Sequence, residues 1–163
     1  MSVLRSGAVA ETVRQPILMW TYEQSTGILR DPTGMPSGRG YAGGDQGKAP
    51  WGINNPSYES VKDEGPIPCG LFTRGAVIET DPKLGNFVIP LVPDEDTAAS
   101  IVAMGRGPFS FYMHGDNIVR AGERAGSDGC IVMGINVRRA FNASLDDQLQ
   151  VIAGPTVQTE ATT

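Results

Sequence analysis

Residues 109–133 read FSFYMHGDNIVRAGERAGSDGCIVM, and two apolar segments frame the loop in the middle of this run. Phe109 to Met113 alternates and is rich in aromatic residues, which predicts a core strand that runs into His114-Gly115. Ile131 to Met133 is a second short apolar segment and follows Cys130 directly. A histidine and a cysteine therefore each stand in a glycine-bearing loop beside an apolar segment.

Short strands are also expected on both sides of this run. Residues 17–22 are rich in strand formers, and Gly27 separates them from residues 28–30, which is a hairpin pattern. Residues 54–56, Asn-Asn-Pro, predict a turn, because the residue before a proline avoids the helical region. Further strands are predicted at 71–73, 86–91 and 148–153.

Two short helices complete the expected elements. Asp94, Asp96 or Thr97 can cap a helix over 98–104 that Gly105 ends, and residues 136–142 have helical character.

The 21 glycines and 12 prolines among 163 residues favour short strands and turns over a helix bundle. We expect a mainly β fold, a β-sandwich or mixed sheet with one or two short helices. One domain is predicted over 17–154, with a loose lead-in over 1–16 and a disordered tail over 155–163.

Charge and hydropathy exclude several classes of partner. The formal net charge of −5 and the pI near 4.8 argue against a nucleic-acid partner and give no reason to expect adsorption on an anionic membrane. No run approaches the ~20 apolar residues of a membrane span. Arg5, Glu11 and Arg14 interrupt the apolar region that a cleavable secretion signal needs. We therefore expect synthesis in the cytoplasm without such a signal and no membrane insertion.

The counts of cysteine and histidine limit the covalent and metal chemistry. Cys69 and Cys130 are too few for a disulfide framework, although one disulfide between them is possible. A structural zinc site takes four Cys or His-type ligands, and the chain has two cysteines and one histidine. Neither a metal nor another cofactor is predicted, and Cys69 is expected to be structural.

The loop around Cys130 has the features that a nucleophilic thiol needs. Glycines such as Gly129 allow a sharp turn and a close approach of the backbone to a substrate. The N–H groups of Gly129 and Cys130 can face a developing oxyanion. His114 can take the thiol proton as a general base. On this pattern alone two structural interpretations stay open, in which Cys130 is a small buried hydrophobe and His114 is satisfied by a carbonyl.

His114-Gly115 followed by residues 127–131, Ser-Asp-Gly-Cys-Ile, resembles the active-site motif of the L,D-transpeptidases, the YkuD-like family. Residues 65–72 also look like that family's Pro-x-Gly-x-Phe/Tyr segment. More specifically, the chain resembles the L,D-transpeptidase effectors of bacterial type VI secretion. The motifs shared with that branch are Trp20 and Tyr22, Gly40-Tyr41-Ala42-Gly43, Asn54-Asn55-Pro56, Gly65-Pro66-Ile67-Pro68 and His114-Gly115-Asp116-Asn117, so the resemblance extends from about Trp20 to Ile152.

The resemblance implies an L,D-transpeptidase-like fold and acyl transfer on peptidoglycan tetrapeptide stems, with Cys130 as nucleophile and His114 as base. It also implies that the Gly115 carbonyl orients His114. The chain departs from the broader family in three ways. Asp128 stands where that family has a histidine, the spacer between His114 and Ser127 is somewhat short, and no arginine is obvious soon after Cys130.

Further candidates for substrate contact lie in the loops around these two residues. Asp116 and Asn117 can meet the ends of a zwitterionic stem, although Asp-Asn is also ordinary turn chemistry. Ser127 can contact substrate or hydrogen-bond within its own turn, and Asp128 beside it is a further candidate. Tyr41 can line the cleft or plug a local core.

The resemblance to effectors also implies partners and a location. The type VI secretion machinery would export the chain to the periplasm of a target cell, and the producing cell would need an immunity protein. One alternative is an endopeptidase of the NlpC type, but there the cysteine precedes the histidine in the chain. Another alternative is a non-catalytic β-rich module of a secretion or phage tail assembly, in which Cys130 would be buried and slow to alkylate.

Overall fold

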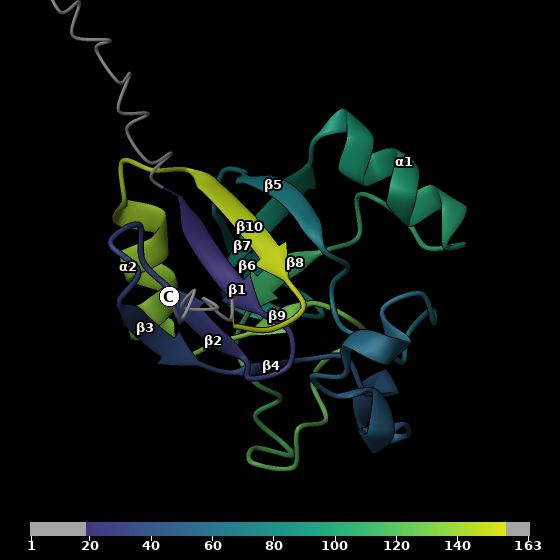
Figure 1. The fold of residues 1–163 in the computed structure, drawn as a ribbon. Helices are drawn as coiled ribbons and strands as arrows, with labels where there is room; N and C mark the ends of the chain where they lie inside the picture. Colours follow the sequence, from purple (N-terminus) through teal and green to yellow (C-terminus); the bar gives the residue numbers. More distant parts are fainter. Residues whose placement is uncertain (1–18, 156–163) are drawn as a thin grey trace, which may run out of the picture.

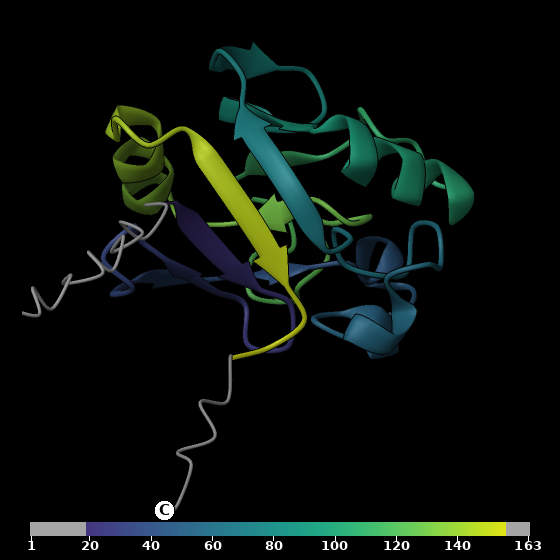
Figure 2. The same cartoon turned by 45° about the horizontal axis from the view of Figure 1, so that its top comes forward.

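The structure is a computed structural model and describes residues 19–155. The predicted lead-in over 1–16 lies outside the described residues, as does the predicted tail over 155–163 except for Pro155. Figure 1 shows the fold as a ribbon, and Figure 2 shows it from a second direction.

The chain is mainly β and forms a single mixed sheet of ten strands with two short helices, so the predicted fold class is confirmed in its mixed-sheet form. The two helices, α1 (Glu95–Ala103) and α2 (Ile135–Ala143), lie on opposite sides of the molecule in both views (Figures 1 and 2). The strands are β1 (Trp20–Glu23), β2 (Ile28–Arg30), β3 (Pro36–Arg39), β4 (Tyr41–Ala42), β5 (Gly70–Arg74), β6 (Ile78–Asp81), β7 (Gly85–Pro93), β8 (Tyr112–His114), β9 (Ile131–Val132) and β10 (Gln148–Ile152).

The order of the strands brings the two ends of the sheet together. The order is β3-β2-β1-β10-β5-β7-β8-β9-β4, and β6 pairs with β7 outside this path. Only Gly40 separates β3 from β4, so the strands at the two ends of the path are neighbours in the chain. A Cβ on Gly40 would overlap the carbonyl oxygen of Val132, which explains why glycine stands where the chain passes from one part of the sheet to the other.

Local signals in the sequence are confirmed where they are strongest. β1 and β2 form the predicted antiparallel hairpin, with Tyr22 opposite Leu29. Helix α1 begins after Asp94, whose side chain accepts a hydrogen bond from the Thr97 N–H at 2.8 Å. Gly105 follows the helix with a φ of +76°, as expected of a residue that ends it.

The strand predicted over 109–113 is wrong at its beginning. β8 begins only at Tyr112, and the side chain of Phe109 is 69% exposed. The Ser110 hydroxyl donates to the carbonyl of Gly107 at 2.7 Å, a local bond that favours a turn over an extended chain. β3, β4 and β6 were not predicted. β3 and β4 lie within residues 31–47, a segment dense in glycine and proline.

The core lies against β1, β10, β5, β7 and β8. Its largest fully buried apolar side chains include Tyr22, Phe72, Ile89, Met113, Ile131, Phe141 and Leu149. Met113 is fully buried and Tyr112 only partly, so Met113 is the core residue of this pair. None of the helices within 19–155 has the length and apolar character needed to cross a membrane.

Candidate active site

Strands β8 and β9 bring the histidine and the cysteine to one site. They pair in parallel, with Met113 opposite Ile131 and His114 opposite Val132. Because side chains alternate along a strand, Met113 and Ile131 point into the core, where both are fully buried. Tyr112 and His114 point to the other face, and Cys130, immediately before β9, lines the same cavity as these two residues.

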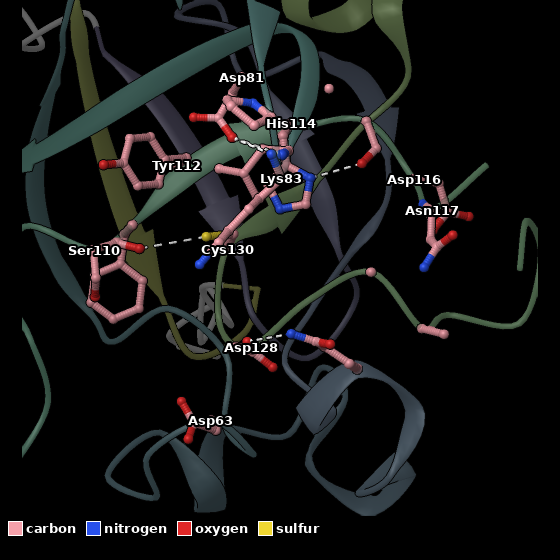
Figure 3. A pocket seen from close by; sticks show the side chains of 18 of the residues that line it. Asp63, Asp81, Lys83, Ser110, Tyr112, His114, Asp116, Asn117, Asp128 and Cys130 are labelled. Carbon is pink, nitrogen blue, oxygen red and sulfur yellow. Dashed lines mark hydrogen bonds between the residues drawn. The ribbon is translucent and has the colours of Figure 1, made fainter. Parts of the chain in front are cut away.

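This cavity has a volume of about 1120 Å³. Figure 3 shows His114, Cys130, Ser110 and Tyr112 in the upper half of the view, with Asp128 and Asp63 below them. Charged side chains of both signs line the cavity: Asp63, Asp81, Asp116, Asp128, Lys62, Lys83 and Arg106. The space is large enough for a short peptide with ionised groups.

The His114 ring is held in one orientation. The side chain is 3% exposed, and Nδ1 lies 2.7 Å from the carbonyl oxygen of Gly115. A carbonyl can only accept a hydrogen bond, so Nδ1 carries the proton and Nε2 keeps its lone pair. Nε2 is buried and has no hydrogen-bond partner among the described residues. Burial lowers the pKa of His114 below its ordinary value of 6.5, so the ring is neutral at pH 7.

The carbonyl that orients His114 is the one that the sequence resemblance implies. It belongs to Gly115, where a Cβ would come 2.8 Å from Nη2 of Arg138. Arg138 is itself buried and donates to the carbonyls of Met133, Asn86 and Phe87. Its positive charge lowers the pKa of His114 further, after burial. Arg138 therefore packs closely against the backbone of Gly115, directly after β8.

Cys130 is a free, half-buried thiol in the cavity wall, and Cys69 is free as well, so the two form no disulfide. The Cys130 sulfur lies 3.6 Å from the carbonyl oxygen of Ser110. Burial raises the pKa of the Cys130 thiol to about 11, the Asp128 carboxylate raises it too, and the Tyr112 N–H and the Arg106 guanidinium lower it. The thiol is protonated at rest, so its reactivity depends on a base that removes the proton.

Ser127 braces the loop that carries Cys130. Its hydroxyl donates to the carbonyl of Cys130 at 2.6 Å and accepts from the N–H groups of Gly129 at 3.0 Å and Gly43 at 2.9 Å. The side chain is 1% exposed and does not line the cavity. The structure thus places Ser127 in the turn-forming role and away from a ligand. It also occupies the Gly129 N–H, so the Cys130 N–H is the freer of the two predicted oxyanion donors.

Tyr41 and Asp116 join two loops of the site. The Tyr41 hydroxyl donates to Asp116 Oδ1 at 2.5 Å and accepts from the Gly126 N–H at 3.0 Å. Tyr41 is 6% exposed and lies outside the cavity lining, so it acts as a brace. Asp116 lines the cavity, as does Asn117, whose side chain accepts from the N–H groups of Val119 and Arg120. Both side chains are thus engaged in holding their own loop.

Asp128 reaches the cavity from the loop that carries Cys130. Its Oδ2 accepts from Gln46 Nε2 at 2.8 Å, and its Oδ1 is buried without a hydrogen-bond partner in the described chain. Among the residues that the structure describes, no three His, Cys, Asp or Glu side chains gather as metal ligands.

Sequence reasoning missed Arg106 and Lys83, which also line the cavity. Arg106 is 5% exposed and lies within Gly105-Arg106-Gly107, where no local pattern marks a buried cation. Lys83 lies in the turn between β6 and β7, which Asp81 holds by accepting hydrogen bonds from the N–H groups of Lys83 and Leu84.

A scan of protein-family models, a search of curated proteins and a search of solved structures each found no match to this chain.

Proposed function

We propose that the chain is a cysteine-dependent acyl transferase or hydrolase that acts on peptidoglycan tetrapeptide stems, as an L,D-carboxypeptidase, an L,D-transpeptidase or both. The observation that carries the proposal is the state of His114. Its Nδ1 is fixed on the Gly115 carbonyl at 2.7 Å, and its buried Nε2 has no hydrogen-bond partner within residues 19–155. The His114 side chain also shares a cavity with Cys130. A neutral imidazole in this tautomer is prepared to take a thiol proton.

In the first half of the reaction, Cys130 attacks the carbonyl carbon between meso-diaminopimelate and the terminal D-alanine. His114 Nε2 takes the thiol proton while the sulfur–carbon bond forms, and the carbonyl electron pair moves to oxygen. The Cys130 N–H stabilises this oxygen, and the Gly129 N–H does so once it releases Ser127 Oγ. The carbon–nitrogen bond then breaks, His114 gives its proton to the departing D-alanine nitrogen, and a thioester remains.

In the second half, an acceptor attacks the thioester carbon and loses a proton to His114. The carbon–sulfur bond breaks and the sulfur takes the proton back from His114. Water as acceptor yields a shortened stem with a free carboxyl group. The amine of a D-amino acid or of another stem yields an exchanged or cross-linked stem. The cavity volume of about 1120 Å³ leaves room for an acceptor of either kind.

The proposed setting follows from the resemblance to type VI secretion effectors. The enzyme would be delivered to a target cell's periplasm, where removal or exchange of D-alanine depletes the donors for cross-linking. An immunity protein of the producing cell would cover the cavity around Cys130.

The test is to incubate the purified protein, and a Cys130→Ala variant, with disaccharide-tetrapeptide muropeptides and to follow the products by mass. The expected result is loss of D-alanine, or its replacement by an added D-amino acid, with the wild type alone. A folded wild-type protein that leaves the muropeptide unchanged would overturn the proposed function.

One observation favours the alternative of a non-catalytic module. The Cys130 thiol is half-buried with a pKa raised to about 11, which is typical of an unreactive cysteine. Alkylation separates the two proposals. An enzyme requires Cys130 to react in a pH-dependent way that weakens in a His114→Gln variant, whereas a binding module predicts slow alkylation that this substitution does not change.

A further inference from the structure

Arg106 is the most deeply embedded charged residue in the cavity wall. Its guanidinium donates to four backbone carbonyls: Glu59 at 2.6 Å, Pro66 at 2.8 Å, Gly65 at 3.2 Å and Asp128 at 3.2 Å. It also lies over the ring of Phe111, with 5.1 Å between the guanidinium carbon and the ring centroid. One side chain thereby joins the 59–66 loop, the segment before β8 and the loop that carries Cys130.

All four acceptors are neutral carbonyls, so none of them cancels the charge. Within residues 19–155 the ion pairs closer than 4.0 Å are Arg30 with Glu23 and Arg120 with Glu123, and neither includes Arg106. Burial lowers the pKa of Arg106, and the carboxylates of Asp63 and Glu59 favour its charged form from a greater distance. Arginine stays protonated at neutral pH. The protein therefore carries a buried positive charge without a contacting counter-ion, which is costly for stability.

The charge lies directly against the nucleophile loop. Gly129 has a φ of +137°, and a Cβ there would overlap Nη2 of Arg106. Because Gly129 carries no side chain, the guanidinium packs against the peptide next to Cys130. The guanidinium lowers the pKa of the Cys130 thiol, in opposition to the carboxylate of Asp128. This cation thus lies beside the peptide next to Cys130, where the proposed reaction develops negative charge.

We propose that Arg106 is a positioning residue that fixes the Asp128–Cys130 backbone through the Asp128 carbonyl and whose buried positive charge stabilises negative charge on the Cys130 sulfur. The thiol proton goes to His114 Nε2, as in the proposed function on which this role in turnover rests. The thiolate then shares the cavity with two cations, the imidazolium of His114 and the guanidinium of Arg106. The acidic groups around it are Asp128, Asp63 and Glu59, and Arg106 offsets their field.

The test measures the alkylation rate of Cys130 against pH with iodoacetamide, using the full chain and peptide mapping by mass to distinguish Cys130 from Cys69. The variants R106Q and R106M remove the charge, and R106K keeps it. Loss of the charge is expected to raise the thiol pKa by about one unit, which lowers the rate at pH 8 by roughly threefold once the higher nucleophilicity of the more basic thiolate is included. R106K is expected to lie between these variants and the wild type. If one neutral variant fails to fold, the other carries the comparison.

Arg74 offers a matched control. It donates to the carbonyls of Phe141, Asp146 and Ser144 and lies over the Phe141 ring at 5.8 Å, but it does not line the cavity. R74Q should lower the melting temperature without moving the alkylation profile of Cys130. A profile of R106Q and R106M that matches the wild type, or an equal shift in R74Q, would overturn the role of Arg106.

Alkylation and muropeptide turnover, measured together, separate this inference from the proposed function. If the Arg106 variants shift the pKa of Cys130 but the wild type leaves muropeptides unchanged, the effect of Arg106 stands and the proposed enzyme activity is wrong. If turnover depends on Cys130 but R106Q and R106M leave the pH profile of Cys130 alkylation unchanged, the enzyme activity stands and the role of Arg106 is wrong.

Discussion

Cys69 and Cys130 are both free, half-buried thiols, and burial raises the pKa of both, to about 12 and about 11. Their surroundings differ. Cys69 donates to Gln24 Oε1 at 3.5 Å and lies beside Glu59, whose negative charge raises its pKa after burial. Cys130 opens on a cavity with a neutral histidine and has a buried arginine behind its loop. In the proposed function, a group that takes the proton and a cation near the sulfur, more than exposure, distinguish Cys130 from Cys69.

The largest contrast is expected when each cysteine is replaced by alanine. C130A should reduce the release of D-alanine by a factor on the order of 10⁵, because it removes the group that forms the thioester. C69A should keep turnover within about threefold of the wild type, with a loss of stability of roughly 1 kcal/mol. Mass analysis of the muropeptide products measures the first effect, and thermal melting measures the second. Equal losses of turnover in the two folded variants would remove the distinction between the thiols.

Replacing the base should give the next largest effect. H114Q is expected to lower kcat by about 10²–10⁴ with little change in KM, because the general base acts in the chemical step. Alkylation of Cys130 should slow in the same variant, while that of Cys69 should not change, since His114 is the only histidine of the chain. A kcat of H114Q within a few-fold of the wild type would contradict the assignment of His114 as the base.

The pH dependence of turnover and of thermal stability tests the environment of His114 in the folded protein. The pKa of His114 lies below its ordinary value of 6.5 because the ring is buried, so turnover should persist at pH 6.5 and fall only below it. Between the folded pKa and 6.5 the unfolded chain binds more protons, so stability rises with pH through that window. Wild-type protein should therefore lose more thermal stability between pH 7 and pH 5 than H114Q does. Identical losses would show that His114 titrates alike in both states.

Tyr41→Phe should give the smallest effect of the four. It removes the bonds to Asp116 and Gly126 while leaving Cys130 and His114 in place. We expect a loss of about 1–2 kcal/mol in the free energy of unfolding and a decrease in kcat/KM of a few-fold, because the loops at 116 and 126 lose their common brace. Denaturant unfolding and steady-state kinetics measure the two quantities. A decrease in turnover as large as that of H114Q would instead place the Tyr41 hydroxyl in the chemistry.

The elements found from sequence are those with local signals. The β1–β2 hairpin, the Asp94 cap of α1 and strands β7 and β10 each carry their own turn or cap residues. β3 and β4 carry no such signal, because they are strands only through pairing with β2 and β9. The prediction at 109–113 extended a strand through Ser110, whose hydroxyl forms a local turn instead.

The difference between local signals and contacts of distant residues also explains which site residues the sequence predicted. His114 and Cys130 were found because each stands in a glycine-bearing loop beside an apolar segment. Arg106 was missed because its partners Pro66 and Glu59 lie 40 and 47 positions away, and the bond of Tyr41 to Asp116 spans 75 positions. Such contacts exist only after the chain has folded, so no local pattern indicates them.

The order of the strands sets when the candidate site can assemble during folding. β1 pairs in parallel with β10, and β10 in turn pairs with β5, so the last strand within residues 19–155 joins the β1–β2 hairpin to the centre of the sheet. β4 follows β3 after Gly40 and pairs with β9, which begins directly after Cys130. Pairings this distant in sequence form slowly. We therefore expect the loop that carries Cys130 to become ordered only late in folding, after β10 has paired with β1 and β5.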